Sequence, residues 1–198
     1  MAKRKVDGVL LLDKPEGITS NLALQKAKRL FNAEKAGHTG TLDPFATGLL
    51  PLCLGEATKF SQFLLDADKV YLAEVHLGVR TRTADTEGEI LETRPVAVSD
   101  ADIARVLPAF LGEIDQVPPM YSAIKRDGRP LYEYARKGIE LDRPARRVSV
   151  YAIDPVALNG DRLTLRVHSG KGLYVRTLAE DIGAVLGCGA HLSALRRE

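Results

Sequence analysis

The sequence has few of the features that mark secreted, membrane or metal-binding proteins. Its 198 residues contain two cysteines, Cys53 and Cys188, too few for a disulfide framework and without metal-ligand spacing. The longest apolar runs, such as Val9-Leu10-Leu11-Leu12, are far shorter than the roughly 20 residues of a membrane-spanning helix. These absences exclude a disulfide scaffold and a helical membrane protein, and they favour a reducing cytoplasm.

The N-terminus lacks the apolar core of a signal peptide. Met1-Ala2-Lys3-Arg4-Lys5 is basic, as such peptides are, but Asp7, Gly8 and Asp13 interrupt the apolar residues after it. We therefore expect neither secretion nor a membrane partner. The remaining composition, 45% hydrophobic, 27% charged and only 6% aromatic, is that of an ordinary globular protein.

Net charge is nearly balanced at +2, but its distribution along the chain is polarised. The segment 85–115 holds eight acidic and two basic residues, whereas 125–147 holds eight basic and four acidic ones. A basic segment of this size is able to bind an anionic partner such as nucleic acid. A solvated basic surface is the equally simple alternative.

The pattern of apolar residues and turn signals predicts an α+β domain with a mixed, mostly antiparallel central sheet flanked by helices and loops. The hairpin signals Asp127-Gly128 and Asn159-Gly160 outnumber parallel crossovers, and Ser99 with Asp102 resembles a capping box. Strands are predicted over 8–12, 48–54, 70–79, 120–125, 148–158 and 163–167, and helices from Thr19 or Ser20 to about 32, over 56–65, from 99 onward and over 173–186.

The stretch 37–48 is the densest polar and glycine-rich part of the chain. It contains a titratable pair, His38 and Asp43, among small residues that let a backbone or ligand approach closely. It has no Gly-Lys-Ser/Thr pattern and is not a phosphate loop. From these residues alone, Asp43-Pro44 is more often just a turn, and His38 is more often a loop residue with a satisfied hydrogen bond.

The same stretch, Gly-His-Thr-Gly-Thr-Leu-Asp-Pro-Phe-Ala-Thr-Gly, resembles the signature loop of the TruB-type tRNA pseudouridine synthases, which isomerise the uridine at tRNA position 55. Further blocks in family order cover nearly the whole chain. They are Leu11-Leu12-Asp13-Lys14-Pro15, Leu54-Gly55-Glu56-Ala57-Thr58-Lys59, Lys69-Val70-Tyr71, Pro119-Met120-Tyr121-Ser122-Ala123, Leu131-Tyr132-Glu133-Tyr134-Ala135-Arg136, Tyr174-Val175-Arg176-Thr177-Leu178 and Leu195-Arg196-Arg197.

The resemblance implies three catalytic residues. Asp43 is expected to be the nucleophile, at ribose C1′ or at the base, because a carboxylate can form and release a covalent adduct. Tyr71 is expected to lie against the target uracil. Arg176 is expected to pair with Asp43 through its planar guanidinium. Without the resemblance, Tyr71 is explained as a core aromatic and Arg176 as a surface arginine.

The resemblance also implies RNA contacts. His38 would contact the opened tRNA loop, Lys14 and Tyr174 would lie near the substrate, and Leu195 would line the uracil pocket. A basic insertion at about 120–147 would clamp the T-arm stem-loop of tRNA, through phosphate contacts. The basic residues expected to bind RNA there are Lys125, Arg126, Arg129, Arg146 and Arg147.

The resemblance further predicts a single catalytic domain over 1–198, without cofactor or metal, acting as a cytoplasmic monomer. The family usually has a Thr at the position of Leu173, and it usually continues past Glu198 into a C-terminal RNA-binding domain, which we expect to be absent here. Two alternatives remain: a non-catalytic tRNA-binding or folding chaperone, and a related pseudouridine synthase acting on another RNA.

Overall fold

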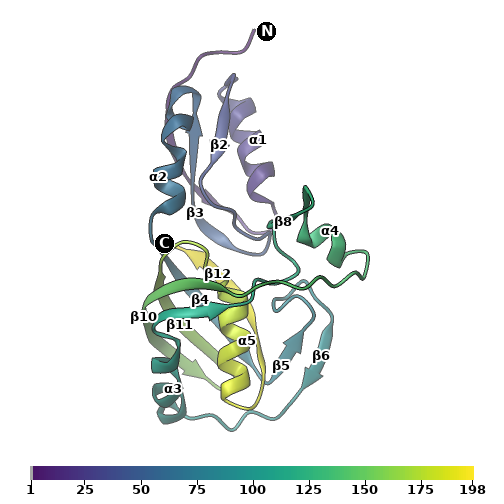
Figure 1. The fold of residues 1–198 in the computed structure, drawn as a ribbon. Helices are drawn as coiled ribbons and strands as arrows, with labels where there is room; N and C mark the ends of the chain where they lie inside the picture. Colours follow the sequence, from purple (N-terminus) through teal and green to yellow (C-terminus); the bar gives the residue numbers. More distant parts are fainter. Residues whose placement is uncertain (1) are drawn as a thin grey trace. The chain divides into compact units, whose positions relative to one another are not determined.

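The computed structural model describes residues 2–198, and it divides the chain into two compact units. Unit 1 comprises the chain up to Leu72 together with Ala194–Glu198, and unit 2 comprises Ala73–Ser193. The strands β4 (Lys69–Leu77) and β12 (Ala190–Arg197) contribute residues to both units. Many of the elements are labelled in Figure 1. Each unit mixes helices with sheet strands, so the predicted α+β class is confirmed.

Unit 1 is built on β1 (Gly8–Lys14) and β3 (Thr47–Leu54), which pair antiparallel along their whole length. The short β2 (Ala36–His38) pairs antiparallel with β3, and the end of β12 pairs parallel with its beginning. The helices of this unit are α1 (Ser20–Leu30), the 3-10 helix η1 (Gly55–Phe60) and α2 (Ser61–Asp66).

Helix α1 begins as its sequence predicts. The Thr19 side chain accepts a hydrogen bond from the backbone N–H of Leu22, which satisfies one of the free donors of the first turn. Ala23, Leu24 and Ala27 form its buried face, and the helix packs against β2 and β3. The loop that joins β2 to β3 is therefore supported by a rigid helix and strand.

Unit 2 contains the strand order β12-β4-β11-β10-β7. The hairpin of β10 and β11 turns through Gly160-Asp161, close to the predicted Asn159-Gly160 signal. The remaining bounds in this unit are β5 (Val79–Thr81), β6 (Ile90–Thr93), α3 (Asp100–Val106), η2 (Leu107–Phe110), β7 (Gly112–Gln116), β8 (Lys125–Arg126), β9 (Arg129–Pro130), α4 (Leu131–Ala135), β10 (Arg146–Asn159), β11 (Arg162–Ser169) and α5 (Val175–Val185).

Two local predictions in unit 2 are confirmed. Ser99 and Asp102 form a complete capping box at the start of α3, with each side chain bonded to the other's backbone N–H. Asp127 and Gly128 join β8 to β9 with φ angles of 50° and 78°, the left-handed pair that a two-residue hairpin turn requires.

The predicted strand over 120–125 is wrong except at its last residue. Only Lys125 and Arg126 pair as a strand, and the residues before them are irregular. The carbonyl oxygens of Ser122 and Ile124 accept hydrogen bonds from the N–H groups of Tyr132 and Leu131 at the start of α4. Because these backbone groups bond to a helix start, the segment has no strand neighbour to pair with.

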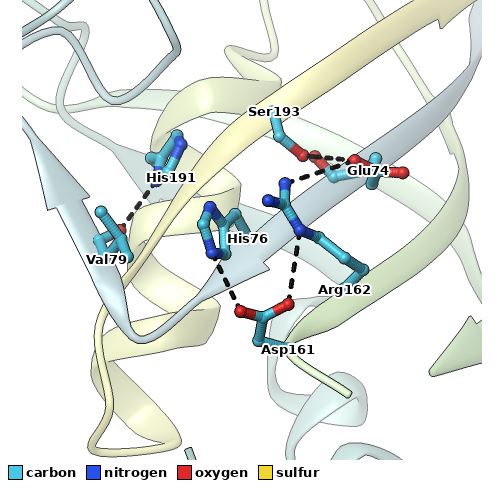
Figure 2. A network of polar contacts seen from close by, with 7 residues as sticks. All are labelled: Glu74, His76, Val79, Asp161, Arg162, His191 and Ser193. Carbon is cyan, nitrogen blue, oxygen red and sulfur yellow. Dashed lines mark hydrogen bonds and ion pairs between the residues drawn. The ribbon is translucent and has the colours of Figure 1, made fainter. Parts of the chain in front are cut away.

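A polar network in unit 2 joins β4, β12 and the β10–β11 turn (Figure 2). His76 Nε2 lies 3.1 Å from an Asp161 oxygen, and Ser193 donates hydrogen bonds to the backbone carbonyl and the carboxylate of Glu74. Arg162 lies within 3.5 Å of both acids. The network therefore fixes β12 against β4 inside this unit.

The buried His191 lies beside that network. Its Nδ1 is 2.9 Å from the carbonyl oxygen of Val79, and its ring centroid is 5.0 Å from that of His76. Burial lowers the pKa of His191, the hydrogen bond to Val79 opposes that shift, and the nearby His76 lowers the pKa further. Among the helices of residues 2–198, none is long and apolar enough to cross a membrane.

Candidate active site

The loop of residues 39–46 between β2 and β3 carries Asp43, which is half-buried, and unit 1 fixes the residues on both sides of it. Before it, the Ser20 hydroxyl accepts a hydrogen bond from the N–H of Leu42 at 2.8 Å and donates one to its carbonyl oxygen at 3.1 Å. Ser20 is 1% exposed and belongs to the first turn of α1. The backbone before the carboxylate is therefore bonded directly to a helix.

After Asp43, the fully buried Lys14 holds Pro44. Its ammonium donates hydrogen bonds to the carbonyl oxygens of Pro15, Ile18 and Pro44 at 2.9, 2.8 and 3.2 Å. The N–H of Gly17 donates to the same Pro44 oxygen at 2.8 Å. This geometry supports a role for Lys14 in holding the loop, and its predicted place near the substrate stays a prediction.

Arg197, at the end of β12, reaches the same loop from the other side. Its Nε donates to the carbonyl oxygen of Leu49 at 2.7 Å, and its Nη2 donates to that of Gly40 at 3.3 Å. Gly48 lies opposite Arg197 in the parallel pair, and a Cβ there would lie 2.0 Å from the Arg197 carbonyl oxygen. Glycine at 48, with a φ of +100°, is what lets the two strands approach.

Tyr71 on β4 is electrostatically coupled to this group of residues. Burial raises the pKa of its hydroxyl, and the negative charge of Asp43 raises that pKa as well, whereas the charge and hydrogen bonding of Arg197 lower it. Asp43, Tyr71 and Arg197 therefore share one site within unit 1. The sequence predicted the first two of these residues, but it gave Arg197 no role of its own.

His38 and Leu195 flank the same region of unit 1. Burial, followed by the positive charge of Arg197, lowers the pKa of His38, so the neutral imidazole is favoured. Within the described part of the chain its Nδ1 is buried without a hydrogen-bond partner. Leu195 is buried on β12, and its carbonyl oxygen lies 3.5 Å from the Thr47 hydroxyl. Their predicted contacts with RNA and uracil stay predictions.

Arg176 lies in the first turn of α5 in unit 2, and it is 4% exposed. Its Nη1 lies 3.2 Å from an oxygen of the equally buried Asp85 and donates to the carbonyl oxygen of Thr83 at 3.0 Å, while Nη2 donates to that of Tyr121 at 2.7 Å. The second Asp85 oxygen accepts hydrogen bonds from the Thr83 hydroxyl and the Glu87 N–H. Arg176 is thus a rigid buried cation, and its pairing with Asp43 stays a prediction.

Tyr174 is positioned by Gln116 at the end of β7. The Gln116 amide accepts a hydrogen bond from the N–H of Tyr174 at 2.8 Å and donates one to its carbonyl oxygen at 3.1 Å. Because Gln116 is only 3% exposed, this pair of bonds anchors the start of α5 to the sheet of unit 2.

A hollow of about 300 Å³ adjoins the partners of Arg176 in unit 2. Thr83 and Tyr121 line it together with the cationic Arg82 and Arg143 and the acid Glu180. Burial raises the pKa of Glu180 above its ordinary value, and the charge of Arg80 opposes that shift. This hollow mixes apolar walls with side chains of both charges.

The basic residues predicted to bind RNA are all exposed, and they fall in two places in unit 2. Arg126 and Arg129 lie directly opposite each other in the β8–β9 pair, with Lys125 beside them. Arg146 and Arg147 open β10, where Arg147 lies 3.4 Å from Asp115. Like charges facing across a strand pair repel each other, and an anionic partner would relieve that repulsion.

Comparisons with known proteins identify the class. A model described as "TruB family pseudouridylate synthase (N terminal domain)" matches residues 28–175, and one for the "tRNA pseudouridylate synthase B C-terminal domain" matches residues 176–198. A solved structure titled "Crystal Structure of a Cbf5-Nop10-Gar1 Complex" contains a chain 38% identical to this one, with a TM-score of 0.76, over 96% of this chain and 47% of that one. The fold is that of the pseudouridine synthases.

Two curated relatives are closer in sequence, and both are named tRNA pseudouridine synthase B. The protein from Aromatoleum aromaticum is 65% identical over 98% of this chain, and the one from Thiobacillus denitrificans is 65% identical over 99% of it. This chain spans 63% and 66% of their lengths. The chain belongs to the TruB family of pseudouridylate synthases.

Proposed function

We propose that this chain isomerises uridine to pseudouridine in the T-loop of tRNA, at position 55, with Asp43 as the covalent catalyst. The observation that carries the proposal is the loop of Asp43 in unit 1, where Ser20 and Lys14 fix the backbone on both sides of this residue. The charge of Asp43 also raises the pKa of the Tyr71 hydroxyl. A carboxylate held in this way is preorganised to attack a sugar or base carbon.

The reaction requires the uridine to leave its stack, at a cost of a few kcal/mol. Stacking on an aromatic such as Tyr71 returns roughly 1–3 kcal/mol of that cost. Asp43 attacks ribose C1′ or the base and forms a covalent adduct, the N1–C1′ bond breaks, a C5–C1′ bond forms, and the bond to Asp43 breaks again to release the carboxylate. C5 loses a proton and N1 gains one, so the product is an isomer of the substrate and no co-reactant is consumed.

Two other sets of residues complete the proposal. Arg176, held by Asp85, would pair with Asp43 and keep it ionised. The exposed Lys125, Arg126, Arg129, Arg146 and Arg147 would contact phosphates of the T-arm and position it without reading its sequence. A tRNA substrate places the protein in the cytoplasm, and we expect it to act as a monomer.

The identities favour tRNA over another RNA as the substrate. The curated relatives at 65% identity are named for tRNA, whereas the chain of the Cbf5-Nop10-Gar1 complex is 38% identical. A tRNA-binding chaperone would have no need for a carboxylate held near a half-buried tyrosine, and that feature favours the enzyme.

The test incubates the purified chain with a T-arm stem-loop RNA and maps pseudouridine by carbodiimide modification and primer extension. We expect one modified position with the parent chain and none with Asp43→Asn, which should still bind the RNA because binding depends on many phosphate contacts. A stem-loop lacking the target uridine is the matched RNA control. Equal turnover by Asp43→Asn would refute the covalent role, and RNA binding without any product would favour the chaperone.

A further inference from the structure

Arg197 has contacts that none of the expected roles explains. Its side chain is 4% exposed, although arginines are almost never fully buried unless they are paired. Its hydrogen bonds to Gly40 in the loop of Asp43 and to Leu49 on β3 join β12 to the chain on both sides of Asp43. These carbonyl groups accept hydrogen bonds from the Arg197 guanidinium but carry no net charge. The positive charge of Arg197 is therefore not neutralised by them and acts on its other neighbours.

The backbone around Arg197 is shaped to admit it. A Cβ at Gly48 would lie 2.0 and 2.7 Å from its carbonyl oxygen and nitrogen, and a Cβ at Gly40 would lie 3.3 Å from Nη1. Both glycines have positive φ angles, of +100° and +93°. Two residues of the 37–48 stretch thus make room for the strand and the side chain of Arg197.

The charge of Arg197 acts on two residues predicted to belong to the active site. It lowers the pKa of the Tyr71 hydroxyl, which burial raises by a larger amount. It also lowers the pKa of the His38 imidazole, which burial lowers by a larger amount. Asp43 acts on the same hydroxyl of Tyr71 with the opposite sign. The tyrosine therefore lies in the combined field of one cation and one carboxylate.

We propose that Arg197 is a positioning residue of the reaction, which holds the loop of Asp43 on β12 and, from this strand next to β4, keeps Tyr71 beside that loop. This inference rests on the proposed function, because it assigns Arg197 a part in the same site. Arg197 acts through Asp43 and Tyr71, and the family resemblance assigned it no role.

The first test compares Arg197→Gln with Arg196→Gln. Arg196 is the neighbouring residue on β12, but it is exposed and bonds Asp13 at 3.0 and 2.8 Å instead. Under single turnover with saturating enzyme, we expect Arg197→Gln to form product on the order of 10²-fold more slowly, as after loss of one oriented donor. The RNA Kd should change less than about threefold, because phosphate contacts dominate binding.

A lysine at position 197 distinguishes the effect of the positive charge from the effect of the forked hydrogen bonds. Arg197→Lys retains the cation but loses the forked hydrogen bonds, and we expect a rate between those of the parent and Arg197→Gln. An Arg197→Gln rate equal to that of Arg196→Gln would overturn the proposal. So would a loss that appears only in Kd, since that would make Arg197 an RNA contact.

The second test needs no RNA. Urea midpoints are measured for Arg197→Gln, Tyr71→Phe and the double variant, with Arg197→Lys replacing the glutamine variant if that one does not fold. If Arg197 acts on the Tyr71 hydroxyl, the double variant should shift the midpoint by less than the sum of the single shifts. Additive shifts would overturn the proposal. A parent chain inactive on RNA would refute the proposed function alone, because this coupling would still be measurable.

Discussion

Arg176 and Asp85 form an ion pair of 3.2 Å in which the two side chains are 4% and 2% exposed. Taking two charges out of water is costly, and their attraction repays that cost only where the remaining donors and acceptors are satisfied. Here the Thr83 and Tyr121 carbonyl groups bond the guanidinium, and the Glu87 N–H bonds the carboxylate. The pair therefore presents Arg176 in one orientation.

Replacing Asp85 by Asn should destabilise unit 2 strongly. The substitution leaves Arg176 buried without its counter-charge, and breaking such a pair costs about 3–5 kcal/mol. The control is Glu89→Gln, which removes an exposed ion pair with Arg82 and should cost less than about 1 kcal/mol. Urea unfolding checks both values, and similar midpoints for the two variants would contradict the structural role of Asp85.

Arg176→Lys should slow turnover while the protein stays folded. Lysine retains the charge but cannot bridge Asp85, Thr83 and Tyr121 together, and the resulting misplacement should reduce single-turnover rates on the order of 10²-fold. Circular dichroism should show a folded protein. A kinetically silent Arg176→Lys variant would count against the predicted pairing with Asp43.

The salt dependence of RNA binding should report the β8–β9 surface. Phosphate contacts make log K fall linearly with log salt concentration, and losing one such contact should reduce the slope by about 1. Arg129→Glu is therefore expected to flatten the slope, whereas Arg105→Glu, on α3 and equally exposed to solvent, should not. Equal slopes for the two variants would place the RNA-binding surface elsewhere.

Acid should destabilise the protein through the buried His191 and the half-buried His38. Burial lowers the folded-state pKa of His191 and of His38 below that of the unfolded chain, so the unfolded chain binds more protons as the pH falls. Stability should be highest above about pH 6.5 and should fall as the pH drops through that value toward the folded-state pKa. His191→Asn keeps a donor toward Val79 but does not titrate, and thermal unfolding at pH 7.5 and 5.5 should show a smaller difference for it than for the parent.

Much of the local structure could be predicted because its causes lie within a few residues. The capping box of Ser99 and Asp102 spans four positions, and the hairpin turn at Asp127-Gly128 depends on two residues that tolerate a positive φ. The Asp43 loop stood out for the same reason, as a dense local pattern of glycine and polar residues. The segment before Lys125 failed because its hydrogen bonds go to α4, which its own residues do not indicate.

Other features were decided by contacts between distant parts of the chain. Strand β12 was missed because buried residues of mixed type, Ala190, His191, Leu192 and Arg197, give it no apolar alternation. Nothing in the sequence around Asp85 indicates that it pairs with the buried Arg176, 91 positions later.

The sequence by itself determined the class of fold, the loop of Asp43 and the family. The first two depend on local patterns of residues, and the family depends on motifs that occur along the chain in the family's order. Only the tertiary structure decided that Ser20 and Lys14 hold that loop, and that Arg197 reaches it across 148 positions to bond Leu49. Burial sets the strength and partners of a charge, and burial depends on what the folded chain brings together.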